Sequence, residues 1–328
     1  MTDVAVHEFP RSFVRTIRDA RRVLVTTHRS PDGDAVGSSL AAGHMIASLG
    51  GLVEVWIPDG VPPPYRFLPG AAEVRGGDPP GGAFDATLVL DTSEPGLLGR
   101  PLPPAGLGGR VLVIDHHLAG GGLGDETVAA PAAATGELVW DLALCLGFTP
   151  DLAFASCVYV AILTDTGMFR YDLTSPRSHA LAARCLDLGV SPYDVARHVY
   201  ELYPPSYLAV WAELLATLEV DMGGRFATLT VPDGLLERHG VTEDALEEVV
   251  GYPRGIAGVE VAALVRHKAD GRVRVSLRST GRINVSDLAR RFGGGGHFGA
   301  AGCDLPPGTD LAEARRRIAG ALADMIGP

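Results

Sequence analysis

The sequence is poor in the features that mark secreted, zinc-ribbon and membrane proteins. It has 4 cysteines in 328 residues and no C-x-x-C pair, which argues against a disulfide scaffold or a zinc ribbon. No stretch approaches the ~18 uninterrupted apolar residues of a membrane span, and the first 20 residues contain no continuous apolar segment of a signal peptide. We therefore expect a soluble cytoplasmic protein with no membrane partner.

Positive charge is also scarce, since 28 basic residues face 39 acidic residues and the net charge is −11. A protein that coats long duplex nucleic acid should be basic, so this class is disfavoured. The charges are unevenly distributed: residues 1–260 carry 17 basic and 33 acidic side chains, and residues 261–328 carry 11 and 6. This segregation is either a chance property of the surface or the sign of a metal site in an acidic body with an anion-binding segment.

The length predicts two domains. Continuous Val/Leu/Ile runs alternate with helical patterns through residues 1–190, which is typical of an α/β fold with a parallel sheet and helices on both faces. Strands are expected over residues 22–27, 53–57, 86–90 and 111–114, and helices over 35–49, 135–146, 151–163 and 178–188.

The pattern changes in the second half. Residues 191–218 form a helical connection, and residues 219–328 are expected to form a smaller α/β domain. Its expected strands are 226–231, 258–266 and 273–278, and its expected helices are 242–250, 286–291 and 310–325.

Acidic and imidazole side chains recur just past the ends of the predicted strands. They are His28, Asp32, Asp34, Asp91, Asp115, His116 and His117, and Asp165 follows an apolar helix. Ligands of open α/β sheets bind outside the carboxyl ends of the strands. Each residue alone could be a helix cap or a turn former, but their joint occurrence predicts a metal cluster. Nitrogen and oxygen ligands suit manganese, magnesium or zinc, and the excess of carboxylates favours manganese.

A second motif is the glycine run Gly293–Gly296, which is followed by His297. Successive glycines allow backbone amides to point at an anion, as in a phosphate-binding nest. Arg278 and Ser279 end a predicted strand nearby, and Arg is a natural bidentate partner of phosphate. The alternative is a flexible linker, which the position of the run inside a predicted domain disfavours.

These motifs, taken in order, resemble those of the DHH phosphoesterases. The metal-ligand motifs resemble the four motifs of the family, and Gly293–His297 resembles the glycine-rich motif of the first type of DHH-associated domain. Residues 134–137 and 164–171 are similar to the short two-domain branch, which comprises oligoribonucleases that also act as 3′-phosphoadenosine-5′-phosphate (pAp) phosphatases. The resemblance extends from about residue 20 to residue 305.

The resemblance implies two Mn²⁺ ions, with Mg²⁺ or Co²⁺ as substitutes, that activate a hydroxide for attack on phosphorus. It assigns His28, Asp32 and Asp91 to one ion, and Asp34, Asp91, His116 and Asp165 to the other. The implied catalytic residues are Asp91, Asp115, His116 and His117, where His117 faces the scissile phosphate and Asp115 orients its neighbours. The substrate would lie in a cleft between the domains, held by Arg278, Ser279, Gly293, Gly294, Gly295, Gly296 and His297.

The expected activity is the hydrolysis of RNA oligonucleotides of 2–5 nucleotides, including pApA, to 5′-mononucleotides, together with pAp phosphatase activity. The alternatives are a soluble cyclic-di-AMP phosphodiesterase and a non-catalytic nucleotide- or RNA-binding module. An oxidoreductase is disfavoured because no G-x-G-x-x-G follows the first strand. A homodimer is compatible with the resemblance.

Overall fold

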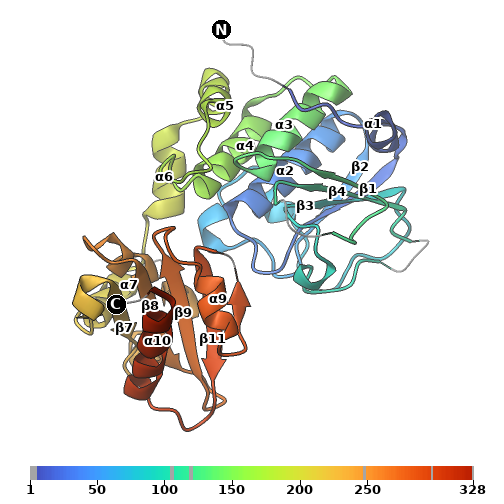
Figure 1. Cartoon of the computed structure of the whole chain (residues 1–328). Helices are drawn as coiled ribbons and strands as arrows, with labels where there is room; N and C mark the ends of the chain where they lie inside the picture. Colours follow the sequence, from blue (N-terminus) through green and yellow to red (C-terminus); the bar gives the residue numbers. More distant parts are fainter. Residues whose placement is uncertain (1–5, 104–106, 118–120, 247–248, 297, 327–328) are drawn as a thin grey trace. The chain divides into compact units, whose positions relative to one another are not determined.

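The computed structural model describes residues 6–103, 107–117, 121–246, 249–296 and 298–326, and it divides the chain into two compact units (Figure 1). The N-terminal unit comprises Met1–Leu202 and the C-terminal unit comprises Tyr203–Pro328. The division lies within the connection expected over residues 191–218. Within the described residues, no helix has the length and hydropathy needed to cross a membrane.

A five-stranded parallel sheet forms the centre of the N-terminal unit. The strands are β1 (Arg22–Thr26), β2 (Leu52–Trp56), β3 (Ala86–Leu90), β4 (Arg110–Asp115) and β5 (Glu126–Ala129), in the order β2-β1-β3-β4-β5. The chain leaves β1 toward one edge and later returns to the other side of β1 as β3. The carboxyl ends of β1 and β3 therefore flank the topological switch point, where open α/β sheets bind ligands.

Helices cover one face of this sheet (Figure 1). The helices of the unit are α1 (Arg11–Asp19), α2 (Gly33–Ser48), α3 (Thr135–Leu146), α4 (Leu152–Asp165), α5 (Pro176–Asp187) and α6 (Pro192–Tyr200). Side chains of alternate strand positions, such as Val25 and Leu88, pack against α2, α3 and α4 in the main core. Glycines allow close approach between these helices, because a Cβ at Gly37 of α2 would lie 2.5 Å from the carbonyl oxygen of Cys157 in α4.

The other face of the sheet differs from the expectation of helices on both faces. Its strand side chains, including Val89 and Val113, pack against Leu98 and Leu123, which lie outside the α-helices. Leu98 directly follows a single 3-10 turn, Pro95–Leu97. The connections on this side are rich in glycine and proline, which disfavour a continuous helix. In the part of the chain that the structure describes, loops and this turn take the place of the second helical layer.

The C-terminal unit contains a six-stranded mixed sheet in the order β10-β11-β9-β8-β7-β6. One face of this sheet packs against the helices Val285–Arg290 and Leu311–Ile326. The other face packs against the helix Pro205–Leu215, through Trp211 and Leu214. The elements are α7 (Pro205–Leu215), β6 (Glu219–Asp221), β7 (Phe226–Thr230), α8 (Leu235–His239), β8 (Val261–His267), β9 (Val273–Ser279), α9 (Val285–Arg290), β10 (Gly295–Gly296), β11 (Ala300–Leu305) and α10 (Leu311–Ile326).

The prediction of a helix over residues 242–250 is wrong. The described part of that segment forms the 3-10 turns Glu243–Leu246 and Val249–Gly251. The indole Nε1 of Trp211 donates to the carbonyl oxygen of Ala245 at 2.6 Å, so a tertiary contact takes the acceptor that an α-helix would use. The two-sheet α/β architecture itself is confirmed.

Candidate metal centre

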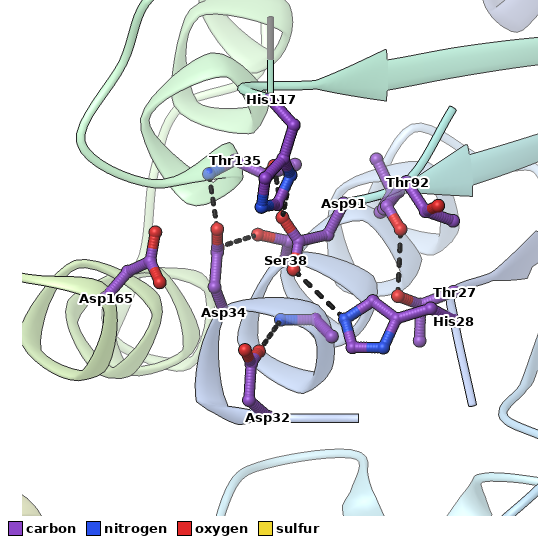
Figure 2. Close-up of polar contacts among 12 residues, drawn as sticks. Thr27, His28, Asp32, Asp34, Ser38, Asp91, Thr92, His117, Thr135 and Asp165 are labelled. Carbon is purple, nitrogen blue, oxygen red and sulfur yellow. Dashed lines mark hydrogen bonds and ion pairs between the residues drawn. The ribbon is translucent and has the colours of Figure 1, made fainter. Parts of the chain in front are cut away.

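The predicted metal ligands converge at the carboxyl ends of β1 and β3, beside the first turn of α2 and the last turn of α4 (Figure 2). Three groups of residues can be defined such that, within each group, the possible ligand atoms lie within 4.8 Å of one another. The groups are His28–Asp32–Asp91, Asp34–His116–Asp165 and Asp91–His116–His117. The structure therefore brings together all six residues that the sequence predicted as metal ligands.

Asp91 lies at the centre of the cluster and belongs to two of the groups. Its Oδ2 is 3.3 Å from His28 Nε2, and its Oδ1 is 3.5 Å from His116 Nε2, so the two oxygens face different histidines. The residue follows β3 with a left-handed φ of 63°, and its amide donates to the carbonyl oxygen of Ile114 at 2.9 Å. A non-glycine residue held in this conformation stores strain, which is typical of functional positions.

Asp34 is buried at the start of α2 and accepts hydrogen bonds on both oxygens. Its Oδ2 accepts from the amide of Thr135 at 2.6 Å, and its Oδ1 accepts from the amide of Gly136 at 3.0 Å and from Ser38 Oγ at 2.7 Å. These two amides open α3, whose N-cap residue, Ala134, has no capping side chain. Asp34 thus caps a helix that lies 101 residues further along the chain.

The contact between His116 and Asp165 tests whether the site fits a cation. His116 Nδ1 lies 3.1 Å from the carbonyl oxygen of Ala132, so this nitrogen is the donor, and Nε2 carries a lone pair whenever the imidazole is neutral. Nε2 nevertheless lies 3.1 Å from Asp165 Oδ2, which is buried and has no hydrogen-bond partner in the described residues. Two acceptors that face each other in a buried place are suited to share a cation, so the donor set fits a metal ion.

His28 and Asp32 form the opposite side of the cluster. The Nδ1 of His28 lies 2.8 Å from the carbonyl oxygen of Arg29, which leaves Nε2 to face Asp91. Asp32 is the N-cap of α2 and accepts from the amide of Ala35 at 3.0 Å through Oδ1. The residue that caps α2 is therefore Asp32 and not Asp34, which the sequence suggests as the cap of a helix beginning at Ala35, and the other oxygen of Asp32 remains available as a ligand.

Burial and mutual repulsion work against negative charge in this cluster. Burial is the largest cause of the raised pKa values of Asp34 and Asp91, and neighbouring carboxylates raise them further. The pKa of Asp165 rises to about 9, first through burial and then through Asp34 and Asp32. Carboxyl groups that resist ionisation without a counter-ion are expected where cations normally supply the compensating charge.

His117 and Asp115 form a pair at the edge of the cluster. Asp115 is buried, and its Oδ1 lies 2.8 Å from His117 Nδ1 and accepts from the amide of His117 at 3.0 Å. Burial raises the pKa of Asp115, but the hydrogen bonds from His117 and Ser93 outweigh it and the net pKa is lowered. The same contact raises the pKa of His117, whose side chain is 43% exposed. The imidazole is therefore oriented by Asp115 and open to solvent.

Sequence reasoning missed Thr135, Gly136 and Ser38, which hold the ligands in place. Ser38 and Thr135 point at Asp34 in Figure 2. Thr135 also donates from Oγ1 to Asp91 Oδ1 at 2.9 Å. The available signal was a helix that begins at Thr-Gly behind an alanine, with no side chain to cap it.

In the C-terminal unit, Arg278 and Ser279 lie at the end of β9. Arg278 pairs with Ala300 of β11 and is partly buried, and its Nη1 donates to the carbonyl oxygen of Leu277 at 3.1 Å. Ser279 is buried, and its Oγ accepts from the amides of Gly281 and Ile283 at 3.1 and 3.4 Å. The Ser279 hydroxyl thus stabilises the turn that follows β9.

The glycine run has a structural use. The amides of Gly293 and Gly294 donate to the carbonyl oxygens of Arg290 and Ala289 at 3.1 and 2.9 Å, so these two amides are not available to a phosphate. Gly295 and Gly296 pair with β11, and a Cβ at Gly296 would lie 2.6 Å from the carbonyl oxygen of Ala300. The run is glycine because backbones approach closely here. His297 lies outside the described residues.

Comparison with known families identifies the class. The model of the DHH family N-terminal domain matches residues 22–162, and the model of the DHHA1 domain matches residues 223–324. The range matched by the DHH model contains five of the six predicted metal ligands and ends three residues before the sixth, Asp165. The chain belongs to the DHH family, and the resemblance found in the sequence is confirmed.

Individual relatives narrow this class. The chain is 36% identical over 311 residues to the bifunctional oligoribonuclease and PAP phosphatase NrnA of Thermus thermophilus, covering 93% of this chain and 90% of the relative. It is 24% identical to the Bacillus subtilis protein of the same name, covering 89% and 92%. The crystal structure of an exopolyphosphatase-related protein from Bacteroides fragilis superposes with a TM-score of 0.88 at 26% identity over 95% of both chains.

Proposed function

We propose that this protein is a manganese-dependent phosphoesterase that hydrolyses RNA oligonucleotides of 2–5 nucleotides to 5′-mononucleotides and removes the 3′-phosphate of pAp. The coarser class, a hydrolase of phosphoric ester bonds, follows from its family and relatives. The observation that carries the two-cation part of the proposal is Asp91, whose two oxygens face the histidines of two adjacent ligand groups. The proposed substrates are those for which the NrnA relatives are named. This arrangement suits a pair of cations with one shared carboxylate.

His28, Asp32 and Asp91 would hold one cation, and Asp34, Asp91, His116 and Asp165 would hold the other. When bound, two divalent cations supply an activated water as the nucleophile and neutralise the charge that develops on the transferring phosphoryl group. The protein contributes the orientation of the ligands. The carbonyl oxygens of Arg29 and Ala132 hold the protons on the Nδ1 atoms of the two histidines, so both Nε2 atoms point into the cluster.

The exposure of the His117 side chain supports a role on the substrate. Asp115 accepts a hydrogen bond from His117 Nδ1, so the exposed imidazole can carry a proton on its other nitrogen as well, which its raised pKa favours. We assign His117 the task of hydrogen-bonding a non-bridging oxygen of the scissile phosphate. The far end of the nucleotide is proposed to be held by Arg278, Gly295, Gly296 and His297.

The charge of the chain supports a short substrate. A net charge of −11 repels a long polyanion, while the basic segment 261–328 provides local attraction for one or two phosphates. The cytoplasm is the proposed location.

The test is a substrate panel with the purified full-length chain and Mn²⁺. The panel contains pApA, RNA 5-mers, an RNA 24-mer, pAp and cyclic-di-AMP, and the products are resolved by ion-exchange chromatography. We expect 5′-AMP from pApA and pAp, slower cleavage of the 24-mer, and little turnover after chelation of the metal.

Other outcomes would replace the proposal. A preference for cyclic-di-AMP over pApA would indicate a cyclic-dinucleotide phosphodiesterase. Tight oligonucleotide binding without any product would indicate a binding module, and a preference for the 24-mer would contradict the size argument.

A further inference from the structure

Thr135 connects ligands that come from two different strand ends. Its backbone amide donates to Asp34 Oδ2 at 2.6 Å, and its hydroxyl donates to Asp91 Oδ1 at 2.9 Å. Asp34 and Asp91 come from the β1–α2 and β3–β4 connections, and Thr135 is the first residue of α3. One fully buried residue thus holds a carboxylate from each of the two connections.

The hydroxyl of Thr135 decides which Asp91 oxygen faces which side. A hydroxyl has one proton to donate, and this proton goes to Oδ1, the oxygen that faces His116. Oδ2 then remains directed at His28. Without this donor, the buried Asp91 carboxyl group could rotate about its side-chain torsion, which is soft for aspartate.

The start of α3 is itself held by ion pairs from α5. Arg177 of α5 donates to Glu137 Oε2 at 3.1 Å and to Asp141 Oδ2 at 2.7 Å, one and two turns into α3. Both carboxylates are almost fully buried, so they anchor the helix firmly. Thr135 therefore has a fixed position, and its β-branched side chain has few alternative rotamers.

We infer that Thr135 is a positioning residue that sets the orientation of the shared ligand Asp91 and thereby couples the two halves of the metal centre. This inference rests on the proposed function. Thr135 is fully buried and both of its donors are engaged by ligand carboxylates, so it acts through the ligands, and its loss should weaken metal binding and turnover while leaving substrate affinity nearly unchanged.

The test compares Thr135→Val, which keeps the shape and removes the donor, with Thr135→Ser, which keeps the donor. Calorimetric titration of the metal-free chain with Mn²⁺ measures affinity, and pApA hydrolysis at saturating Mn²⁺ measures kcat and KM. We expect Thr135→Val to lose about 10- to 100-fold in Mn²⁺ affinity or kcat, with KM within about threefold, and Thr135→Ser to recover most of the loss.

Thr87→Val is the matched control for a lost buried hydroxyl. Thr87 is equally buried in β3, and its Oγ1 donates to the carbonyl oxygen of Gly108 at 2.7 Å, away from the cluster. It should lower thermal stability by an amount similar to Thr135→Val without changing Mn²⁺ affinity.

The outcomes separate the two proposals. If the wild-type chain neither binds Mn²⁺ nor hydrolyses pApA, the proposed function fails. If the wild-type chain does both, and Thr135→Val matches it in affinity and kcat or loses no more than Thr87→Val, the positioning role is overturned. A loss in Thr135→Ser as large as in Thr135→Val would overturn it as well, since the donor is retained there.

Discussion

At the scale of single residues, the geometry of the candidate ligands requires arrangements that are locally unfavourable. Asp91 has a left-handed backbone, and its buried carboxyl group has a strongly raised pKa. Asp34 caps α3, whereas helices are usually capped by a serine, threonine, asparagine or aspartate next to their first turn. Such local conflicts are expected at functional sites, where binding a cation compensates for them.

Asp91→Asn should therefore separate function from stability. Asparagine tolerates the left-handed conformation, so the backbone is preserved, while the charge that two cations would share is lost. We expect turnover of pApA to fall by at least ~100-fold. The metal-free variant should melt at a higher temperature than the metal-free wild type at pH 8, because burying Asp91 requires either a negative charge or the uptake of a proton, and asparagine requires neither.

Calorimetry with a chelator, paired with the hydrolysis assay, measures both effects. Asp59→Asn is the control, because Asp59 is exposed, accepts from the amide of Ser30 at 2.7 Å and lies outside the ligand groups. Wild-type turnover in Asp91→Asn would show that the ligand assignment is mistaken.

At the scale of elements, the packing of α2 on α4 determines where the ligands lie. Asp34 begins α2 and Asp165 ends α4, so the distance between them depends on how closely these helices approach. Gly37 permits this approach, and Gly136 permits the close packing of α3 on α4, since a Cβ on Gly136 would lie 2.6 Å from the Cβ of Ala161. A strand-end pattern locates the ligands along the sequence, but the helix contact places them in space.

Gly37→Ala tests this contact. Its methyl group would meet the carbonyl oxygen of Cys157 at 2.5 Å and the amide of Ala161 at 3.1 Å, both of them backbone atoms that cannot move aside easily. We expect a loss of about 1–3 kcal/mol in the free energy of unfolding and weaker Mn²⁺ binding, because α2 carries Asp34.

Gly320→Ala in α10 is the control, since the glycine is exposed and a Cβ there meets nothing within 4 Å. That variant should gain about 0.4–1 kcal/mol. Urea unfolding with a chelator, together with Mn²⁺ titration, measures both variants; unchanged stability in Gly37→Ala would contradict the close-contact argument.

At the scale of the whole molecule, stability, pH and metal binding are linked. The raised pKa values of Asp34, Asp91 and Asp165 mean that the folded, metal-free chain holds protons that the unfolded chain releases near pH 4. Stability falls with rising pH wherever the folded state binds more protons. The contribution of these groups is therefore present below about pH 4 and is lost as the pH rises toward 9.

We accordingly expect the melting temperature of the metal-free chain to fall between pH 5.5 and pH 8.5, and the gain on adding Mn²⁺ to grow over the same range. Metal binding displaces these protons, so it becomes more favourable as the pH rises. Carboxyl groups with lowered pKa values, such as Asp270 at about 2, titrate below this window and do not affect the trend. Differential scanning calorimetry with chelator or Mn²⁺ measures the trend, and an equal gain at both pH values would contradict it.

The sequence alone determined the class of the fold and named the six candidate ligands that the structure brings together. Continuous apolar strands predict a parallel sheet, and acidic or imidazole residues at strand ends predict a site at the carboxyl edge. These features are local, because each is carried by a few adjacent residues such as Thr27 and His28 or Asp115 and His116. The two sheets were foreseen for the same reason.

Only the tertiary structure decided how the ligands are held. Thr135 and Asp34 are 101 residues apart, and no spacing rule relates a helix start to a carboxylate on a different element. The layer of loops over the second sheet face and the engagement of the Gly293 and Gly294 amides also depend on packing between distant segments. The local sequence pattern indicates which helix, strand or turn each segment can form. Burial and long-range hydrogen bonds determine which polar groups of that segment remain available for chemistry.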